Sequence, residues 1–183
     1  MDFEPVSITL KDGRTALLRP PKADDAAPML AELRKECGET EFLLRAPQEC
    51  DGMTVEGEAS WLKGMLDSPA TMLIMCEVDG EIAGNCQIAF NDRVKRHHLA
   101  VIGIGLQKKF WGLGIGTAMF RLMEEEARRH PEAQLMELEF IEGNSRARAL
   151  YEKMGFRVVG IHPNAVLLSS GPASLYIMQK PLR

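Results

Sequence analysis

The stretch Val101-Ile-Gly-Ile-Gly-Leu-Gln-Lys-Lys-Phe-Trp-Gly-Leu-Gly-Ile-Gly-Thr117 contains an apolar run that leads into three alternating glycines. After them, apolar residues repeat at helical spacing, which predicts a helix over about 114–130. Because glycine has no β-carbon, successive backbone N–H groups can converge at the positive end of that helix. The sequence therefore predicts a cradle for a negatively charged group, such as a phosphate.

The spacing of these glycines differs from that of two common nucleotide-binding loops. A Walker loop needs Gly-x-x-x-x-Gly-Lys followed by Ser or Thr, and no lysine precedes Thr117. The dinucleotide fingerprint Gly-x-Gly-x-x-Gly is not met either, since single residues separate the glycines at 112, 114 and 116. A turn whose glycines only allow close packing of strand and helix is the alternative that the glycine pattern leaves open.

Strands and helices are predicted on both sides of this turn. The chain opens with a hairpin of two strands around Asp12-Gly13, a pair typical of tight turns. Further strands are predicted at 71–78, 82–90, 99–106, 135–141, 157–161 and 175–180, and further helices at 23–37, ending at Gly38, at 55–66 and at 144–154, with 39–53 irregular. Antiparallel strands thus precede a β-α-β-α-β order. This order predicts an α/β fold, a mixed and mostly antiparallel central sheet flanked by about four helices.

Length and composition limit the classes of protein. The 183 residues, of which 45% are apolar, suffice for one domain with a full core, so we expect a single domain over 1–183. The net charge is -4 and the basic residues are scattered, so no nucleic-acid surface is expected. No apolar run approaches the ~18 residues of a membrane span, which predicts a cytoplasmic protein without a membrane partner.

The four cysteines, Cys37, Cys50, Cys76 and Cys86, form no Cys-x-x-Cys pair and have no histidines at metal-ligand spacing. We therefore expect reduced, mostly structural thiols and no bound metal.

A second motif, Asn144-Ser-Arg-Ala-Arg-Ala-Leu-Tyr-Glu-Lys-Met-Gly-Phe156, follows the glycine turn. Together with Phe110–Thr117 it resembles the two signature blocks of the GNAT superfamily of acetyl-coenzyme A dependent N-acetyltransferases, in the family's order and at a typical separation. The resemblance is strong over 71–157 and implies the GNAT fold. Trp111 stands where the family usually has Gln or Arg, a departure familiar in subgroups resembling ribosomal-protein and amino-acid acetyltransferases.

The resemblance implies where acetyl-coenzyme A binds. The end of the strand at 99–106 would present backbone groups to the pantetheine arm, and the amides of the glycine turn would hold the pyrophosphate. Lys108 and Lys109 could meet cofactor phosphates or be solvated surface lysines. Asn144 is predicted as a helix cap, and the resemblance makes it a cofactor contact. The cofactor-binding candidates are Ile104, Gly105, Leu106, Trp111, Gly112, Leu113, Gly114, Ile115, Gly116, Thr117 and Asn144.

Acetyl transfer requires a proton for the leaving thiolate. Tyr151 is the candidate acid, because it aligns with the tyrosine that often protonates the coenzyme A sulfur in this superfamily. It shares a helix face with Ala147, Leu150 and Met154, which points it inward. The alternative is a core tyrosine whose hydroxyl has a structural partner.

The base that accepts the proton of the acceptor ammonium is less determined. Glu139, twelve positions before Tyr151, occupies the place of a strand glutamate that resembles the base of protein N-terminal acetyltransferases. Glu137 lies on the same strand face. His97 or His98, or a chain of water molecules, are the alternatives.

The predicted enzyme transfers the acetyl group by direct attack in a ternary complex, without a cysteine nucleophile. The acceptor is a small amine, such as an amino acid, polyamine or antibiotic, or a protein N-terminus. Three acidic residues near the apolar trio at 42–44, namely Glu36, Glu39 and Glu41, would favour a cationic amine. A non-catalytic acyl-coenzyme A sensing module and a kinase-like nucleotide-binding domain are the alternatives. A homodimer is common among proteins resembling this one.

Overall fold

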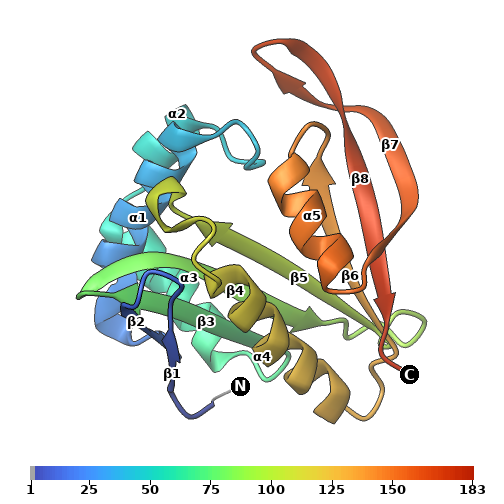
Figure 1. Cartoon of the computed structure of the whole chain (residues 1–183), viewed down its shortest axis with the longest axis horizontal. Helices are drawn as coiled ribbons and strands as arrows, with labels where there is room; N and C mark the ends of the chain where they lie inside the picture. The colour runs from blue at the N-terminus through green and yellow to red at the C-terminus, as the bar shows by residue number, and fades with distance from the viewer. Residues whose placement is uncertain (1–2) are drawn as a thin grey trace.

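The computed structural model describes residues 3–183 and contains one eight-stranded sheet, in the order β1-β2-β3-β4-β5-β6-β8-β7 (Figure 1). Every neighbouring pair is antiparallel except β5 and β6, which confirms the predicted mixed, mostly antiparallel sheet. The strands are β1 (Val6–Thr9), β2 (Thr15–Arg19), β3 (Thr71–Val78), β4 (Glu81–Phe90), β5 (Leu99–Leu106), β6 (Leu135–Ile141), β7 (Arg157–Leu168) and β8 (Gly171–Pro181).

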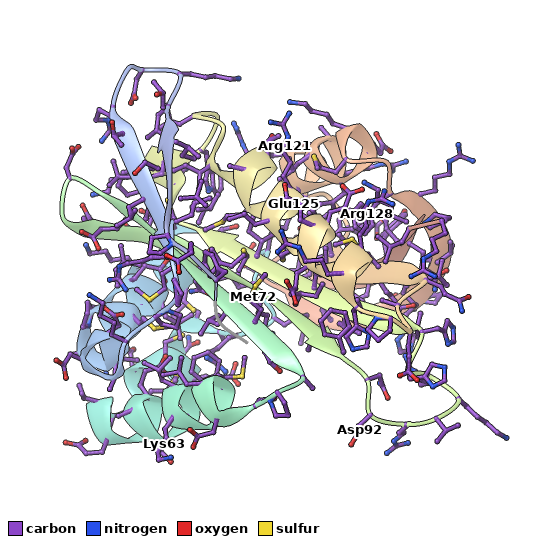
Figure 2. All side chains as sticks on the ribbon, turned by 90° about the horizontal axis from the view of Figure 1, so that it is seen from below. Lys63, Met72, Asp92, Arg121, Glu125 and Arg128 are labelled. Carbon is purple, nitrogen blue, oxygen red and sulfur yellow. The ribbon has the colours of Figure 1, made fainter. Side chains whose placement is uncertain are left out.

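Helices cover both faces of this sheet. They are α1 (Ala26–Glu39), α2 (Pro47–Asp51), α3 (Val55–Asp67), α4 (Ile115–Arg129) and α5 (Ser145–Lys153), with short 3-10 turns at Ala23–Asp25 and Lys108–Phe110. Figure 2 shows α1 and α3 on one side and α4 and α5 on the other. Within residues 3–183, none of these helices combines the length and the apolar character that crossing a bilayer requires.

Strand β3 shows why the two layers of helices are needed. Met72 belongs to the core cluster that contains Met119 of α4, whereas Leu73 belongs to a second cluster with Leu62 of α3. Neighbouring residues of a strand face opposite sides of the sheet, so both faces of β3 are buried. This explains the apolar run at 72–76 within β3, which is typical of strands covered on both faces.

Four elements differ from the sequence prediction. Helix α1 passes through Gly38 and is capped at Thr40, because Gly38 keeps an ordinary negative φ. The five-residue helix α2 lies in the stretch predicted as irregular, where Pro47 begins it and the Glu49 carboxylate accepts the N–H of Ala46 at 2.7 Å. Strands β7 and β8 are longer than predicted. A register shift between His162 and Val166 lets β7 continue through Pro163 and Asn164, two residue types that are common in turns.

Strands β5 and β6 separate soon after they meet. They pair only from Leu99 with Leu135 to Val101 with Glu137, and Figure 1 shows them diverging beyond that point. The N–H of Gln107 donates to the carbonyl of Ala83, so by alternation the backbone groups of Ile104 and Leu106 point away from β4. This open edge of β5 is where the site forms.

Candidate active site

A cavity of about 810 Å³ lies at the open edge of β5. The β1–β2 hairpin, the C-terminal end of α1, the glycine turn and α5 all contribute to its walls. Of the residues predicted from the sequence, those that line it are Ile104, Leu106, Trp111, Gly112, Gly114, Ile115, Gly116, Thr117, Asn144 and Tyr151. Gly105, Leu113 and Glu139 are not among the lining residues.

The three glycines of the turn serve two different purposes. Gly112 and Gly114 have φ values of 78° and 102°, a left-handed conformation that costs other residues energy. Gly116 lies in the first turn of α4, and a β-carbon there would stand 2.9 Å from Cδ2 of Leu150. The turn therefore has the left-handed glycines that a cradle would use, and it also has the close packing that was the alternative.

Four cationic side chains line the cavity: Lys11, Arg121, Arg146 and Lys153. Within residues 3–183 none of them forms an ion pair with a carboxylate, although the chain carries a net charge of -4. The guanidinium of Arg146 lies 5.1 Å from the centre of the Trp111 ring, and Figure 2 shows Arg121 on α4 beside α5. Unpaired cations beside a glycine turn suit a ligand with several phosphates.

These cations are not the ones that the sequence indicated. Lys108 and Lys109 do not line the cavity, and the Lys109 ammonium pairs with Glu81 at 2.5 Å. Arg121 lies four residues after Thr117 on the same helix, so helical spacing from the glycine turn could have pointed to it. Arg146 lies inside the second motif, on α5.

Side chains bond both backbone groups of Leu106. Its N–H donates to Oε1 of Glu36 at 2.7 Å, and its carbonyl accepts the indole N–H of Trp111 at 2.6 Å. Trp111, the residue that departs from the family pattern, thus contacts the strand edge directly. A pantetheine arm can pair with Ile104 as the strand stands, whereas pairing with Leu106 requires Glu36 or Trp111 to move.

Tyr151 lines the cavity and is held in an aromatic cluster. Its ring centre lies 5.5 Å from that of Phe120 and 5.8 Å from that of Phe140. Burial raises the pKa of Tyr151 to about 12, so the phenol stays protonated at neutral pH. Asn144 caps α5, as predicted, by accepting the N–H of Ala147 at 3.1 Å, and so helps to place Tyr151.

The residues predicted as bases lie elsewhere. Glu139 is exposed on the face of β6 opposite to Phe140, which packs against Tyr151. Glu137 accepts a hydrogen bond from Gln179 at 2.7 Å. The two histidines precede the start of β5, where Nδ1 of His97 lies 4.0 Å from Glu132. None of these side chains lines the cavity.

A buried pair of carboxylates on α1 lies at the cavity instead. Glu36 is 5% exposed and lines the cavity, and burial raises its pKa to about 7. Glu32, one turn earlier, is 2% exposed, and neither of its oxygens has a hydrogen-bond partner within residues 3–183. Burial, followed by the charge of Glu36, raises the pKa of Glu32 to about 8. The sequence offered Glu36 only as one of several acidic residues near the acceptor and did not single out Glu32.

Comparison with known proteins agrees with this geometry. Residues 29–156 match the Acetyltransferase (GNAT) family. An L-amino acid N-acetyltransferase of Escherichia coli is 25% identical over 137 residues, which cover 75% of this chain and 80% of that protein. A GNAT acetyltransferase structure from Streptococcus pneumoniae superimposes with a TM-score of 0.83 at 24% identity, covering 91% of this chain and 98% of that one.

A Salmonella typhimurium structure, solved with its cofactor acetyl-coenzyme A, superimposes with a TM-score of 0.77 at 16% identity and covers 91% of this chain and 93% of that one. The family match spans most of the chain, including the glycine turn, the carboxylate pair and Tyr151. The chain therefore belongs to the GNAT family and is an N-acetyltransferase that uses acetyl-coenzyme A.

Proposed function

We propose that this enzyme transfers the acetyl group of acetyl-coenzyme A directly to the primary amine of a cationic acceptor. The observation that supports this most is that one cavity joins three features. These are the glycine turn with its unpaired cations, the protonated hydroxyl of Tyr151 and the buried carboxylate of Glu36. Phosphate binding, an acid and a site for a positive charge are what the reaction requires.

The donor would lie along the glycine turn and β5. The backbone N–H groups of the turn, with Arg121 and Arg146, would hold the phosphates, and the backbone of Ile104 would pair with the pantetheine arm. Bound acetyl-coenzyme A supplies an activated thioester. Tyr151 would give its proton to the thioester sulfur as the bond to the acetyl carbon breaks.

The acceptor would enter beside the segment after α1. Phe42 and Leu43 line the cavity and offer apolar contact, while Leu44 is 64% exposed and points away from the core. Amino acids are the first acceptors to test, because the Escherichia coli relative is named for them. Polyamines and peptides with free N-termini carry the same ammonium group.

A panel of amines with detection of released coenzyme A thiol tests this function. We expect thiol release with at least one cationic amine and none with its acetylated derivative. Binding of acetyl-coenzyme A without thiol release from any amine would indicate a sensing module instead. Stronger stabilisation by ATP than by acetyl-coenzyme A would indicate a kinase-like domain.

Gly114→Ala should weaken acetyl-coenzyme A binding by about tenfold. A left-handed conformation costs an alanine ~1–2 kcal/mol, so the turn would relax and its N–H groups would lose their alignment. Isothermal titration calorimetry measures the affinity. Gly13→Ala is the matched control, because Gly13 has a φ of 87° in the β1–β2 turn and does not line the cavity. Equal losses of affinity in both variants would contradict a cradle at Gly114.

The thiols of the native enzyme should react slowly. All four cysteines are buried and free, and none lines the cavity. Burial raises the pKa of Cys37 and of Cys76 to about 12, so thiolates are scarce at neutral pH. An Ellman titration of freshly reduced enzyme should give little rapid reaction before unfolding and four thiols per chain after it. A cysteine that carried labelled acetyl after incubation with the donor alone would contradict direct transfer.

A further inference from the structure

We propose that Glu36, supported by Glu32, receives the ammonium group of the acceptor and takes one of its protons. This inference rests on the proposed function and adds the residue that acts on the acceptor. It replaces Glu139, which the sequence favoured, by a carboxylate that lines the same cavity as Tyr151.

The position of Glu36 depends on a glycine of β5. A β-carbon at Gly105 would stand 2.4 Å from Oε2 and 2.8 Å from Oε1 of Glu36, so only glycine leaves room for this carboxylate. The Leu106 N–H bonds Oε1. No N–H group of residues 3–183 donates to Oε2, and the residue lines the cavity. A cation in the cavity is therefore the natural partner for Oε2.

Lys11, Arg121, Arg146 and Lys153 line the same cavity, but no cationic side chain of residues 3–183 forms an ion pair with Glu36. From α1, Glu32 and Glu39 add negative charge, and Lys35 pairs with Glu81 at 3.0 Å. From the strand side, the N–H of Lys108 bonds the carboxylate of Glu39 at 2.5 Å. Tyr151 lines the same cavity and is neutral.

Glu32 adds to the negative charge that has no paired cation near Glu36. It is buried one helical turn from Glu36 with both oxygens unpaired within residues 3–183. Two buried carboxyl groups at this spacing cannot both ionise cheaply, so the raised pKa values keep the pair incompletely ionised near neutral pH. An arriving ammonium would restore the missing positive charge and favour the ionised form of Glu36.

The proton balance closes with Tyr151. Glu36 takes one proton from the acceptor ammonium, which frees the nitrogen lone pair to form the bond to the acetyl carbon. The carbon–sulfur bond breaks, and Tyr151 gives its proton to the sulfur. A second proton from the nitrogen replaces the one that Tyr151 lost. The products are the neutral amide, coenzyme A thiol and protonated Glu36, which returns its proton to water.

The test compares Glu36→Gln with wild type, using an amine that the panel identifies. We expect kcat/KM for the amine to fall about 100-fold near neutral pH. The loss should shrink as the pH approaches ~10, where amines are already deprotonated. The Kd for acetyl-coenzyme A should stay within about threefold of wild type, as should the activity of the matched variant Glu39→Gln.

Gly105→Ala provides an independent variant, because it displaces the Glu36 carboxylate without removing it. It should lower kcat/KM for the amine in the same pH-dependent way.

Several outcomes would overturn the assignment. A wild-type pH profile in Glu36→Gln, a selective loss of acetyl-coenzyme A binding, or a larger loss in Glu139→Gln would each do so. In these cases wild type still releases thiol, so the proposed function stands. Absence of thiol release by wild type with every amine would overturn both proposals.

Discussion

Tyr151→Phe is expected to lower kcat by about 100- to 1000-fold, because the substitution removes the hydroxyl of a residue that lines the cavity and leaves the ring. The leaving thiolate then has no positioned proton donor. The contacts of the ring with Phe120 and Phe140 remain, so the fold and the Kd for acetyl-coenzyme A should stay close to those of wild type. Steady-state kinetics and calorimetry on the same preparation separate the two effects.

The chain's other tyrosine provides the control. Tyr176 lies 5.4 Å, ring centre to ring centre, from Phe140 but does not line the cavity, so Tyr176→Phe should keep wild-type turnover. Since the pKa of Tyr151 is raised to about 12, wild-type kcat should not decline through loss of this proton below about pH 10. Unchanged turnover in Tyr151→Phe would remove this residue from the mechanism.

Glu32→Met is expected to stabilise the protein by about 1–4 kcal/mol at pH ~8. Glu32 is 2% exposed, without a hydrogen-bond partner within residues 3–183, and methionine fills a similar volume without a charge. For a domain of this size, the melting temperature should rise by roughly 2–4 °C per kcal/mol. Calorimetry across a pH series measures the gain.

The pH dependence of this gain has a definite sign. In the unfolded chain Glu32 ionises near its ordinary pKa of 4.5, whereas in the folded protein its pKa is raised to about 8. The unfolded state therefore binds fewer protons between these values, and wild type loses stability as the pH rises through them. The advantage of Glu32→Met should grow over the same range and then level off.

An exposed glutamate of α4 provides the control for this prediction. Glu125→Met should change stability by less than about 1 kcal/mol at every pH, because Glu125 is exposed and its ion pair with Arg129 is long, at 3.9 Å. A Glu32→Met variant that was less stable than wild type at pH ~8 would show that the carboxylate is stabilised in the fold.

Local signals in the sequence were enough to predict most of the strands and helices. Strand β5 and strand β6 have the bounds predicted from their apolar runs, and α5 follows the cap at Asn144. The glycine turn and Tyr151 were found because each lies within one short motif. Periodicity could not reveal α2, since five residues complete little more than one helical turn.

The carboxylate pair could not be found in that way. Glu36 contacts Gly105, which is 69 residues away in the sequence, and this contact depends on how α1 packs over the sheet. Glu32 is buried in a helix whose surrounding sequence is polar, so its pattern is that of a solvated acidic face. Glu139 was predicted from its resemblance to the base of protein N-terminal acetyltransferases, but that resemblance does not show which face of β6 borders the cavity.

The separation of β5 from β6 also leaves an open strand edge. An unpaired strand edge is a template on which a second chain can add a strand. At Leu106 the Glu36 carboxylate and the Trp111 indole already bond the two backbone groups that such a strand would need. Glu36 and Trp111 thus also block strand addition at this edge. Mutating either residue should increase aggregation at high protein concentration when acetyl-coenzyme A is withheld.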